Sequence, residues 1–366
     1  MSTEKQREAI DALVRAGGNK QAAARELGIS RSAFRDRLCG VDPAVKAAMG
    51  AVGTGIVPTG MWVKTKPTDD APGYSTYLRP LENTAADIIE EIRTAFDGVQ
   101  AAPPVTPPVH VSEDLCVLWP LYDVHWGMHA WGLETGGHDY DLKLAERDLL
   151  GAFERVLAMT PACAEAVLLV GGDFFHGDDS TNQTPANKHQ LDVDGRIFKT
   201  IDTAIRALDH VIQRVHAKAQ RVTVRVLRGN HDEHSHMYLT FALAERFRDS
   251  RVTVLKDPRD LFMFQWGRAS IFAHHGYKMK PEDFVMRMAD VCPFWSATRH
   301  RYAYTGHKHS LAARRIGGVN WEQLDAFCPP DAYGSTWTSR RAFKAEVFHK
   351  HSGRVLSAHD PLEREE

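Results

Sequence analysis

Apolar stretches alternate with helix-like patterns along residues 115–350 of this chain. Short continuous apolar runs, typical of buried strands, occupy 115–122, 166–171, 222–227, 252–255, 269–274 and 302–306. Apolar side chains at helical spacing occupy 141–159, 196–218 and 238–248. Strand–helix alternation of this kind is typical of α/β sandwiches, and finishing strands are expected around 341–349. We therefore predict an α/β domain over residues 115–350 and a C-terminal tail over 351–366.

The first 40 residues predict a small all-α unit of short helices. Residues 6–18 place apolar side chains at helical spacing and end in two glycines. A helix over 21–27 then stops at Gly28, which suits a left-handed cap, and Ser30 can cap a following helix. Two helices joined by a short turn with glycine form the pattern of a helix-turn-helix, so residues 1–40 are predicted to be such a domain.

This N-terminal pattern resembles the C-terminal DNA-binding unit of Fis-type regulators. The resemblance lies in the order G-N-x-x-x-A-A-x-x-L-G-I-S-R-x-x-F-x-x-x-L over residues 18–38. It implies that the helix carrying Arg31, Arg35 and Arg37 enters the major groove of DNA. Eight Lys/Arg against five Asp/Glu give residues 1–40 a charge of only +3, so a helix-packing or dimerisation module is the alternative interpretation.

Residues 41–114 are rich in proline, glycine and threonine and predict a linker between two domains. A small hairpin around 60–66 and a capped helix over 84–98 are the elements expected within it. Four prolines near its end predict a stiff spacer that marks the domain boundary: Pro103, Pro104, Pro107 and Pro108.

Composition narrows the class of protein without specifying a chemistry. Of the 366 residues, 43% are hydrophobic and 25% are charged, as in soluble globular proteins. The net charge of −2 means that nucleic-acid binding would need a local basic patch. Five scattered cysteines without a CxxC pair predict a reducing cytosol and argue against a thiolate zinc site. The start MSTEKQREAI lacks a leader pattern, and no apolar run approaches the ~20 residues of a membrane span, so we expect a cytoplasmic protein without a membrane partner.

Histidines gather with acids and an asparagine directly after five predicted strands. The clusters contain, in chain order, Asp123 and His125, Asp173 and His176, Asn230 and His231, His274 and His275, and His307 and His309. Imidazole, carboxylate and amide oxygen together suit Mn, Fe, Zn or Mg better than thiophilic metals. Residues spaced i, i+2 on an extended segment point to one side, so D-x-H and H-x-H each present two ligands together. Because function in α/β folds gathers at strand carboxyl ends, we predict a metal site there.

The order D-x-H…G-D-x-x-H…G-N-H-D…H-G…G-H-x-H resembles the calcineurin-like metallophosphoesterases over roughly residues 115–315. The resemblance implies a four-layer α/β-β/α sandwich with two divalent metal ions, Mn²⁺ being expected first and Fe, Zn or Mg also being compatible. It implies that one ion is held by Asp123, His125, Asp173 and His309. It implies that the second is held by Asp173, Asn230, His307 and His275, with His274 as the alternative to His275.

The same resemblance gives His231 the task of protonating the leaving group, with Asp232 orienting it through a hydrogen bond. The stretch 172-GDFFH-176 looks more like SbcD-type repair nucleases than like protein phosphatases, whose G-D-x-V-D-R-G carries an arginine missing here. By that match, His176 would assist phosphodiester cleavage. The fusion of such a domain to a helix-turn-helix looks like a phage or prophage gene.

Three functions are compatible with these patterns. The leading hypothesis is a metal-dependent phosphodiesterase, a DNA nuclease, with DNA as its partner. The second keeps the enzyme but changes the substrate to a cyclic nucleotide, a nucleotide or a phosphoprotein. The third is a DNA-binding or assembly protein whose phosphoesterase domain is vestigial. The long polar loop 180–196 either shapes specificity or is solvated, and the oligomeric state is left open.

Overall fold

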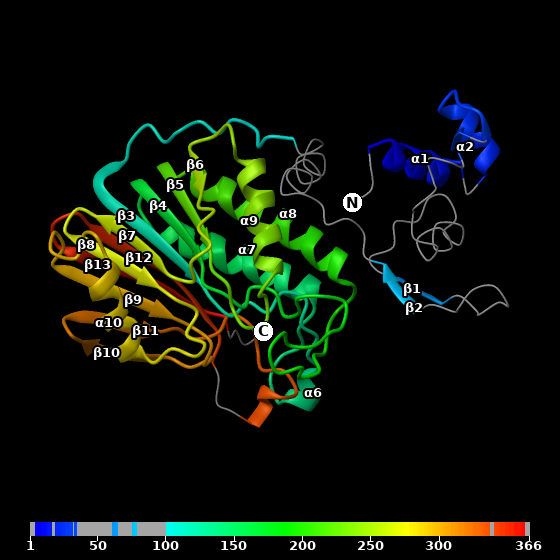
Figure 1. The fold of residues 1–366 in the computed structure, drawn as a ribbon. Helices are drawn as coiled ribbons and strands as arrows, with labels where there is room; N and C mark the ends of the chain where they lie inside the picture. Colours follow the sequence, from blue (N-terminus) through cyan, green and yellow to red (C-terminus); the bar gives the residue numbers. More distant parts are fainter. Residues whose placement is uncertain are drawn as a thin grey trace. The chain divides into compact units, whose positions relative to one another are not determined.

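The structure is a computed structural model that describes residues 4–16, 19–31, 33–34, 61–64, 75–78, 100–336 and 340–362. The chain divides into two compact units, Met1–Ala95 and Phe96–Glu366 (Figure 1). Each unit has its own fold, and the predicted metal-binding residues all belong to the second.

The first unit begins with two helices, α1 (Glu4–Arg15) and α2 (Lys20–Glu26), close to their predicted spans. The side-chain oxygen of Asn19 caps α2 by accepting hydrogen bonds from two backbone N–H groups of its first turn. A small core of buried side chains joins the helices to the segment that follows them: Ala9, Ala12, Leu13, Ala23, Ala24 and Phe34. This shared core explains why two such short helices are stable together.

The turn after α2 has the predicted left-handed glycine and serine cap. Gly28 adopts φ +65°, the left-handed conformation that ends a helix without steric cost. The Ser30 hydroxyl oxygen then accepts a hydrogen bond from the Ala33 N–H at 3.2 Å, so it caps the next helical segment. Arg31 is exposed at the start of that segment. Two other arginines predicted to contact DNA, Arg35 and Arg37, lie outside the described residues.

The described residues between the helices and the second unit form one pair of strands. Strand β1 (Met61–Lys64) pairs antiparallel with β2 (Ser75–Leu78). A small hairpin was predicted around 60–66, and β1 lies there, but its partner β2 begins only at Ser75, farther along the chain than a tight hairpin would place it. The helix predicted over 84–98 lies outside the described residues.

A six-stranded sheet is the centre of the second unit (Figure 1). Its strand order is β13-β12-β3-β4-β5-β6. The parallel strands are β3 (Ser112–Leu121), β4 (Cys163–Val170), β5 (Ala219–Val226) and β6 (Val252–Val254). The antiparallel strands are β12 (Ala342–His349) and β13 (Gly353–Pro361). Every residue of β4 is buried, which explains its continuous apolar sequence.

A five-stranded sheet packs against the first, in the order β10-β11-β9-β8-β7. Its strands are β7 (Phe262–Trp266), β8 (Ala269–Ala273), β9 (His300–Thr305), β10 (Ala312–Ile316) and β11 (Val319–Gln323). Strands β8, β9 and β11 are parallel, whereas β7 and β10 are antiparallel to their neighbours. The sequence predicted β8 and β9 but not the other three strands.

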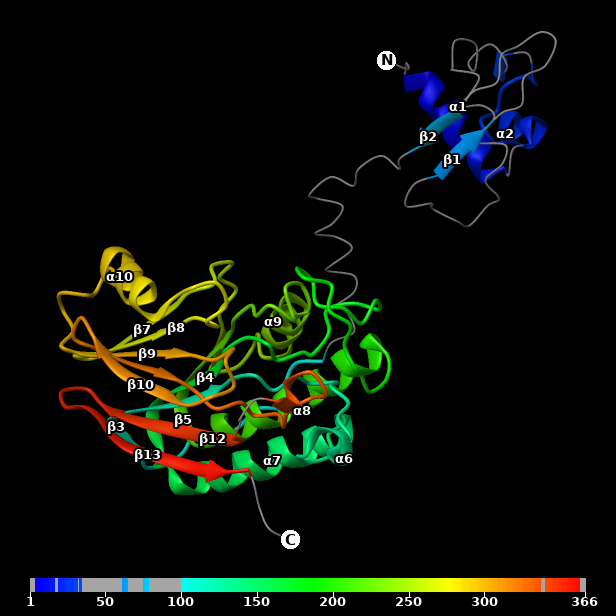
Figure 2. The ribbon, with the colours of Figure 1, turned by 90° about the horizontal axis from the view of Figure 1, so that it is seen from below.

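Helices cover the outer face of each sheet and complete four layers (Figure 2). Helices α7 (Leu142–Met159), α8 (Ile197–His216) and α9 (Ser235–Arg246) pack on the six-stranded sheet. Helix α10 (Pro281–Val291), which was not predicted, packs on the five-stranded sheet. A third apolar core lies between the sheets and includes Leu118, Val167 and Ile271. The predicted four-layer α/β-β/α sandwich is therefore confirmed.

Residues Gly353–Pro361 are part of this sandwich rather than a tail. Strand β13 pairs with β12 from Ala342↔Pro361 to His349↔Gly353, with one bulge. The tail predicted over 351–366 is therefore wrong as far as Pro361. From Ala358 to Pro361, buried and exposed side chains of β13 alternate, as in an edge strand with only one face packed on the protein.

Candidate metal centre

The polar clusters predicted at strand ends meet at one edge of the two sheets. They follow β3, β4 and β5 of one sheet and β8 and β9 of the other. Two groups of ligand atoms each lie within 4.8 Å of one another: Asp123, His125 and Asp173 in the first, Asp173, His275 and His307 in the second. Asp173 belongs to both groups, so its carboxylate lies where two adjacent sites would share a ligand.

The group around His275 is held together by direct polar contacts. His275 Nε2 lies 3.0 Å from Asp173 Oδ2 and 3.2 Å from Asn230 Oδ1. The His307 ring lies against the His275 ring, with centroids 5.3 Å apart. Oxygen and nitrogen donors therefore converge from β4, β5, β8 and β9. We name Asn230, His275 and His307 the His275 side.

The group around Asp123 is more deeply enclosed. His125 Nε2 lies 3.2 Å from His309 Nε2, and that nitrogen of His309 lies 3.8 Å from Asp123 Oδ1. Asp123 is fully buried, and its Oδ1 atom has no hydrogen-bond partner among the described residues. A buried carboxylate oxygen left in this way is unfavourable unless a cation lies beside it. We name Asp123, His125 and His309 the Asp123 side.

Five of these ligand residues have a backbone conformation that is rare for residues other than glycine. Their φ angles are positive: Asp123 50°, His125 48°, Asp173 49°, His307 71° and His309 50°. Such conformations persist only where surrounding contacts overdetermine them, and they cluster at functional sites. The strand-end turns therefore hold these side chains at the site against local conformational preference.

Close backbone approach explains two glycines of the motifs. A Cβ atom added at Gly229 would overlap the Asp173 carboxylate, and one at Gly306 would overlap the Asp123 carboxylate. Any larger residue at either position would push a candidate ligand out of place.

The two neighbouring histidines after β8 point to different places. His275 contacts Asp173 and Asn230, as described above. His274 Nδ1 accepts a hydrogen bond from the Gly276 N–H at 2.9 Å, and its ring packs near Phe284 of α10. Burial lowers the pKa of His274 to about 4. The structure thus brings His275, and not its neighbour, into the ligand group.

His231 lies over the centre beside the Asp123 side. Its ring centroid is 4.7 Å from that of His125, and its backbone N–H donates to Asp173 Oδ1 at 2.8 Å. His231 Nδ1 lies 2.8 Å from the carbonyl oxygen of His176. Since a carbonyl only accepts, Nδ1 carries the proton, and Nε2 is the atom left for proton exchange.

The predicted hydrogen bond from Asp232 to His231 is wrong. The buried Asp232 carboxylate instead accepts from the backbone N–H groups of Gly229, Asp173, Phe174 and Phe175. It therefore ties the turn after β4 to the turn after β5. Burial and the nearby Asp173 raise the pKa of Asp232 to about 7. Its contribution to the centre is to position two turns, while the His176 carbonyl orients His231.

His176 lies behind the centre. Its Nδ1 is 3.0 Å from His125 Nδ1, and its ring stacks on that of His231 with centroids 5.3 Å apart. The side chain is buried, and burial lowers its pKa well below the usual range. His176 is thus placed to orient two other histidines.

Ionisation differs strongly among the ligand residues. Burial lowers the pKa of His307 to about 4, so it is neutral and able to bind a metal near neutral pH. Burial also lowers the pKa of His275, but Asp173 and the other carboxylates outweigh it and raise the pKa to about 9. Burial raises the pKa of Asp173, but His275 and His231 bring it well below the usual range. In the metal-free chain, His275 thus supplies the positive charge between the carboxylates.

A pocket of about 670 Å³ opens beside the centre. The loop 180–196, which was expected either to shape specificity or to be solvated, forms part of its wall through Thr184, Asn187 and His189. Lys188 and Arg196 of that loop do not line the pocket. Residues that the sequence did not single out complete the wall: Tyr277, Lys308, Cys328, Asp331 and Tyr333. Tyr277 and Lys308 adjoin motif residues, so position alone could have indicated them. Cys328 and Tyr333 lie in no motif, and no sequence pattern indicated them.

A family model for calcineurin-like phosphoesterases matches residues 123–362, which is 240 of the 366 residues. This chain belongs to the calcineurin-like phosphoesterase family. It is a metallophosphoesterase, and the family implies divalent metal ions as cofactors. The match begins at Asp123, directly after β3, and ends just after β13, so it covers all the other strands of the two sheets and all the candidate ligands.

A second family model, described as the Fis family of bacterial regulatory proteins, matches residues 7–38. This match covers α1 from residue 7 onward, the whole of α2 and the turn that follows it. No curated protein sequence matches the chain. Of the described residues, none forms a helix with the length and apolar character that crossing a membrane requires.

Solved structures similar to this chain include other phosphoesterases. The phosphoesterase Yfce from E. coli is 13% identical, with a TM-score of 0.35, covering 68% of this chain and 100% of its own. An archaeal phosphodiesterase is 11% identical, with a TM-score of 0.34, covering 67% and 98%. Vps29 from Entamoeba histolytica is 12% identical, with a TM-score of 0.28, covering 67% and 98%. At such identities and TM-scores, these likenesses carry no functional argument.

Proposed function

We propose that this metallophosphoesterase is a phosphodiesterase that hydrolyses DNA with two divalent metal ions. The observation that carries the proposal is the position of Asp173 in both ligand groups. Two ions that share a carboxylate stabilise the attacking and leaving oxygens of an in-line displacement at phosphorus and supply an activated water. The donors suit Mn²⁺ first, and Fe, Zn or Mg as well.

The ligands divide between the two sides of Asp173. The Asp123 side offers a carboxylate and two imidazoles, and the His275 side offers two imidazoles and the amide oxygen of Asn230. The unpaired Oδ1 atom of Asp123 supports a cation on the first side. The Asp173–His275 pair supports a cation on the His275 side. In the metal-free chain, the protonated His275 supplies the positive charge that neutralises the Asp173 carboxylate, and a metal ion would supply it instead.

His231 is the residue we assign to protonating the leaving group. Its Nδ1 proton is held by the His176 carbonyl, which leaves Nε2 to carry the transferred proton. The residue also lines the 670 Å³ pocket, where a substrate would lie. His176 supports this arrangement from behind by packing against His231 and contacting His125.

DNA as the substrate is supported by the N-terminal unit. The match to Fis-type regulators and the exposed Arg31 after a glycine turn are features of a DNA-reading helix. The stretch 172-GDFFH-176, without the arginine of protein phosphatases, favours a phosphodiester and an SbcD-like chemistry. The scattered cysteines, without a CxxC pair, favour a cytoplasmic location for this activity.

A nucleotide is the second candidate substrate. The pocket of about 670 Å³ falls within the ~300–1,000 Å³ typical of small-molecule sites. A cyclic or linear nucleotide presents the same phosphorus chemistry to the centre and would need no contribution from the N-terminal unit.

The test uses the full-length chain loaded with Mn²⁺. Labelled single- and double-stranded DNA, cyclic nucleotides and a model phosphodiester are compared as substrates. The DNA proposal expects cleavage of DNA. Hydrolysis of nucleotides and the model compound without DNA cleavage would favour the second candidate. A chain that retains no metal and hydrolyses nothing would indicate a vestigial domain.

The N-terminal unit is tested by changing Arg31, Arg35 and Arg37 together to Ala. We expect weaker DNA binding and a shallower salt dependence, by roughly one unit of slope for each phosphate that the chain no longer neutralises. Hydrolysis of the model phosphodiester should be unchanged, since these residues lie in the other unit. Unchanged DNA affinity would assign the unit to packing or dimerisation instead.

A further inference from the structure

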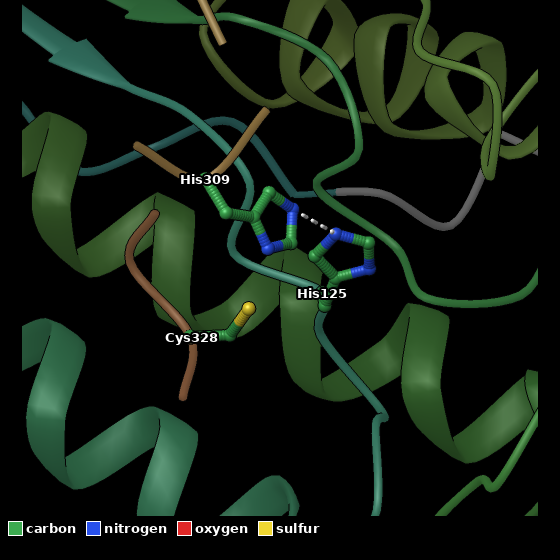
Figure 3. A group of neighbouring side chains, drawn as sticks. All are labelled: His125, His309 and Cys328. Atoms are coloured by element: carbon green, nitrogen blue, oxygen red, sulfur yellow. Dashed lines mark hydrogen bonds between the residues drawn. The ribbon is translucent and has the colours of Figure 1, made fainter. Parts of the chain in front are cut away.

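Cys328 lies beside the Asp123 side of the centre, although its sequence context gives no sign of metal chemistry. Its sulfur and the ring nitrogens of His125 and His309 all lie within 4.8 Å of one another. Figure 3 shows the thiol pointing toward the His309 ring, with the His125 ring just beyond. Of the described cysteines, Cys328 alone belongs to such a group of potential ligands.

The backbone fixes this thiol relative to the candidate ligands. The Cys328 N–H donates to the Asp123 carbonyl oxygen at 3.1 Å, and the Phe327 N–H donates to the same oxygen at 3.2 Å. The segment after β11 is thereby attached to the turn that carries Asp123 and His125. The sulfur therefore keeps its place with respect to the Asp123 side without depending on a flexible loop.

An independent observation indicates that a cation belongs at this position. Asp123 Oδ1 is buried without a hydrogen-bond partner among the described residues and lies 3.8 Å from His309 Nε2. It is an acceptor directed into the same space as the imidazoles. The Cys328 thiol and this oxygen both lie near His309, so a metal ion bound by that imidazole would lie between them.

The distances allow the sulfur to bind an ion that the histidines also bind. Zn²⁺ takes sulfur at ~2.3 Å and imidazole nitrogen at ~2.0–2.1 Å, so two such ligands lie at most ~4.4 Å apart. The Cys328 sulfur and the two imidazole nitrogens lie within 4.8 Å of one another, which is only a few tenths of an ångström beyond that ligand–ligand distance. A small rotation of the Cys328 side chain would therefore suffice.

We propose that Cys328 is a further ligand of the ion on the Asp123 side, binding as a thiolate when a thiophilic divalent metal is present. The inference rests on the proposed metal centre and adds sulfur to its oxygen and nitrogen donors. The metal–sulfur bond forms as the thiol proton leaves to solvent. Because sulfur favours zinc, cobalt and cadmium over manganese and magnesium, this residue biases the metal that the first side retains.

The direct test is the absorption spectrum of the full-length chain loaded with Co²⁺. Thiolate ligation gives a sulfur-to-cobalt charge-transfer band in the near ultraviolet, which nitrogen and oxygen ligands do not produce. We expect the band in the wild-type chain and its loss in Cys328→Ser. Cobalt bound without the band overturns the assignment of Cys328 but leaves the metal centre intact. Failure to retain cobalt at all overturns both.

Metal preference supplies a second readout. Cys328→Ser should weaken Cd²⁺ or Zn²⁺ binding by at least the ~10–100-fold that loss of a supporting partner costs, and Mn²⁺ binding much less. Cys292→Ser is the matched control, because Cys292 is another buried cysteine, at the end of α10 and outside the ligand groups. Equal losses for Cd²⁺ and Mn²⁺ would contradict the proposal.

The wild-type chain also allows a test that does not depend on a folded variant. Cd²⁺ should slow alkylation of Cys328 by at least tenfold, measured by peptide mass analysis, while Cys292 in the same sample changes little. Alkylation of Cys328 at the same rate with and without bound Cd²⁺ would contradict the assignment.

Discussion

The two sides of Asp173 are built differently although both gather imidazoles and oxygen. All three residues of the Asp123 side have positive φ angles, and one of them, His125, contacts His176 and His231. On the His275 side, only His307 has a positive φ angle, and the polar contacts centre on the Asp173–His275 ion pair. Backbone conformation and side-chain packing thus position the Asp123 side, whereas the ion pair between protonated His275 and Asp173 positions the His275 side. The two sides show that adjacent metal sites can be arranged in different ways, one by backbone conformation and the other by a buried ion pair.

The strongest test of this comparison is Asp173→Asn, which alters the ligand common to both sides. We expect metal content to fall on both sides and turnover to drop by at least ~10⁴-fold, since each ion stabilises the transition state by several kcal/mol. Metal analysis and hydrolysis of a model phosphodiester provide the measurements. Asp179→Asn, an exposed aspartate in the same turn, is the matched control and should change neither.

A smaller effect is expected for His231→Ala, which removes the proposed proton donor without touching a ligand. Turnover should fall by about 10²–10⁴-fold while metal content stays unchanged. His129→Ala, an exposed histidine, serves as the control. If His231→Ala loses metal together with activity, the residue is a ligand and the assignment of roles is wrong.

Asn230→Ala separates the two sides directly. It removes an oxygen that contacts His275 and should weaken only the ion on that side, by roughly 10–100-fold. One ion per chain should then be retained at metal concentrations that saturate both sites of the wild type. Asn320→Ala, on β11 and remote from the centre, should retain two. Loss of both ions in Asn230→Ala would mean that the sides do not bind independently.

The pH dependence of metal uptake gives the smallest effect and the most specific one. The raised pKa of His275, about 9, means that its proton stabilises the metal-free chain below pH ~6.5 and that this contribution is lost as pH rises through 9. A metal replaces that proton, so binding on the His275 side should strengthen with rising pH up to about 9. Titration calorimetry in buffers of different ionisation heat near pH 7.5 should detect about one proton released. No release would show that His275 is already neutral.

Strands whose residues are all buried were the most evident from sequence patterns. Strand β4 is wholly buried and reads as one apolar run, so its position and its role at the site were evident. Strands β10 and β11 carry exposed and half-buried polar residues, and their pairing depends on contacts with β9 that no local pattern contains. Helix α10 and strand β7 were missed as well, although both carry buried apolar residues.

The ligand residues could be named because the motifs are local, but the contacts among them could not. Asp232 was expected to hold His231, yet its carboxylate accepts from four backbone groups in two turns. Cys328 comes within reach of His125 across 203 positions, through pairing of the segment after β11 with the turn after β3. Spacing along a chain predicts which side chains share a turn, and only the packed fold decides which turns meet.

The left-handed backbone at five ligand positions has a consequence for how this protein would respond to selection. A chain chosen for stability alone would place glycine or asparagine at Asp123, His125, Asp173, His307 and His309, because those residues tolerate positive φ. Replacing one of the three histidines should therefore raise resistance to heat in metal-free conditions while removing a donor, whereas replacing Asp173 would leave the buried, charged His275 without its partner. Stability and metal binding are opposed at these positions, and laboratory evolution toward thermostability without metal would be expected to lose the centre first.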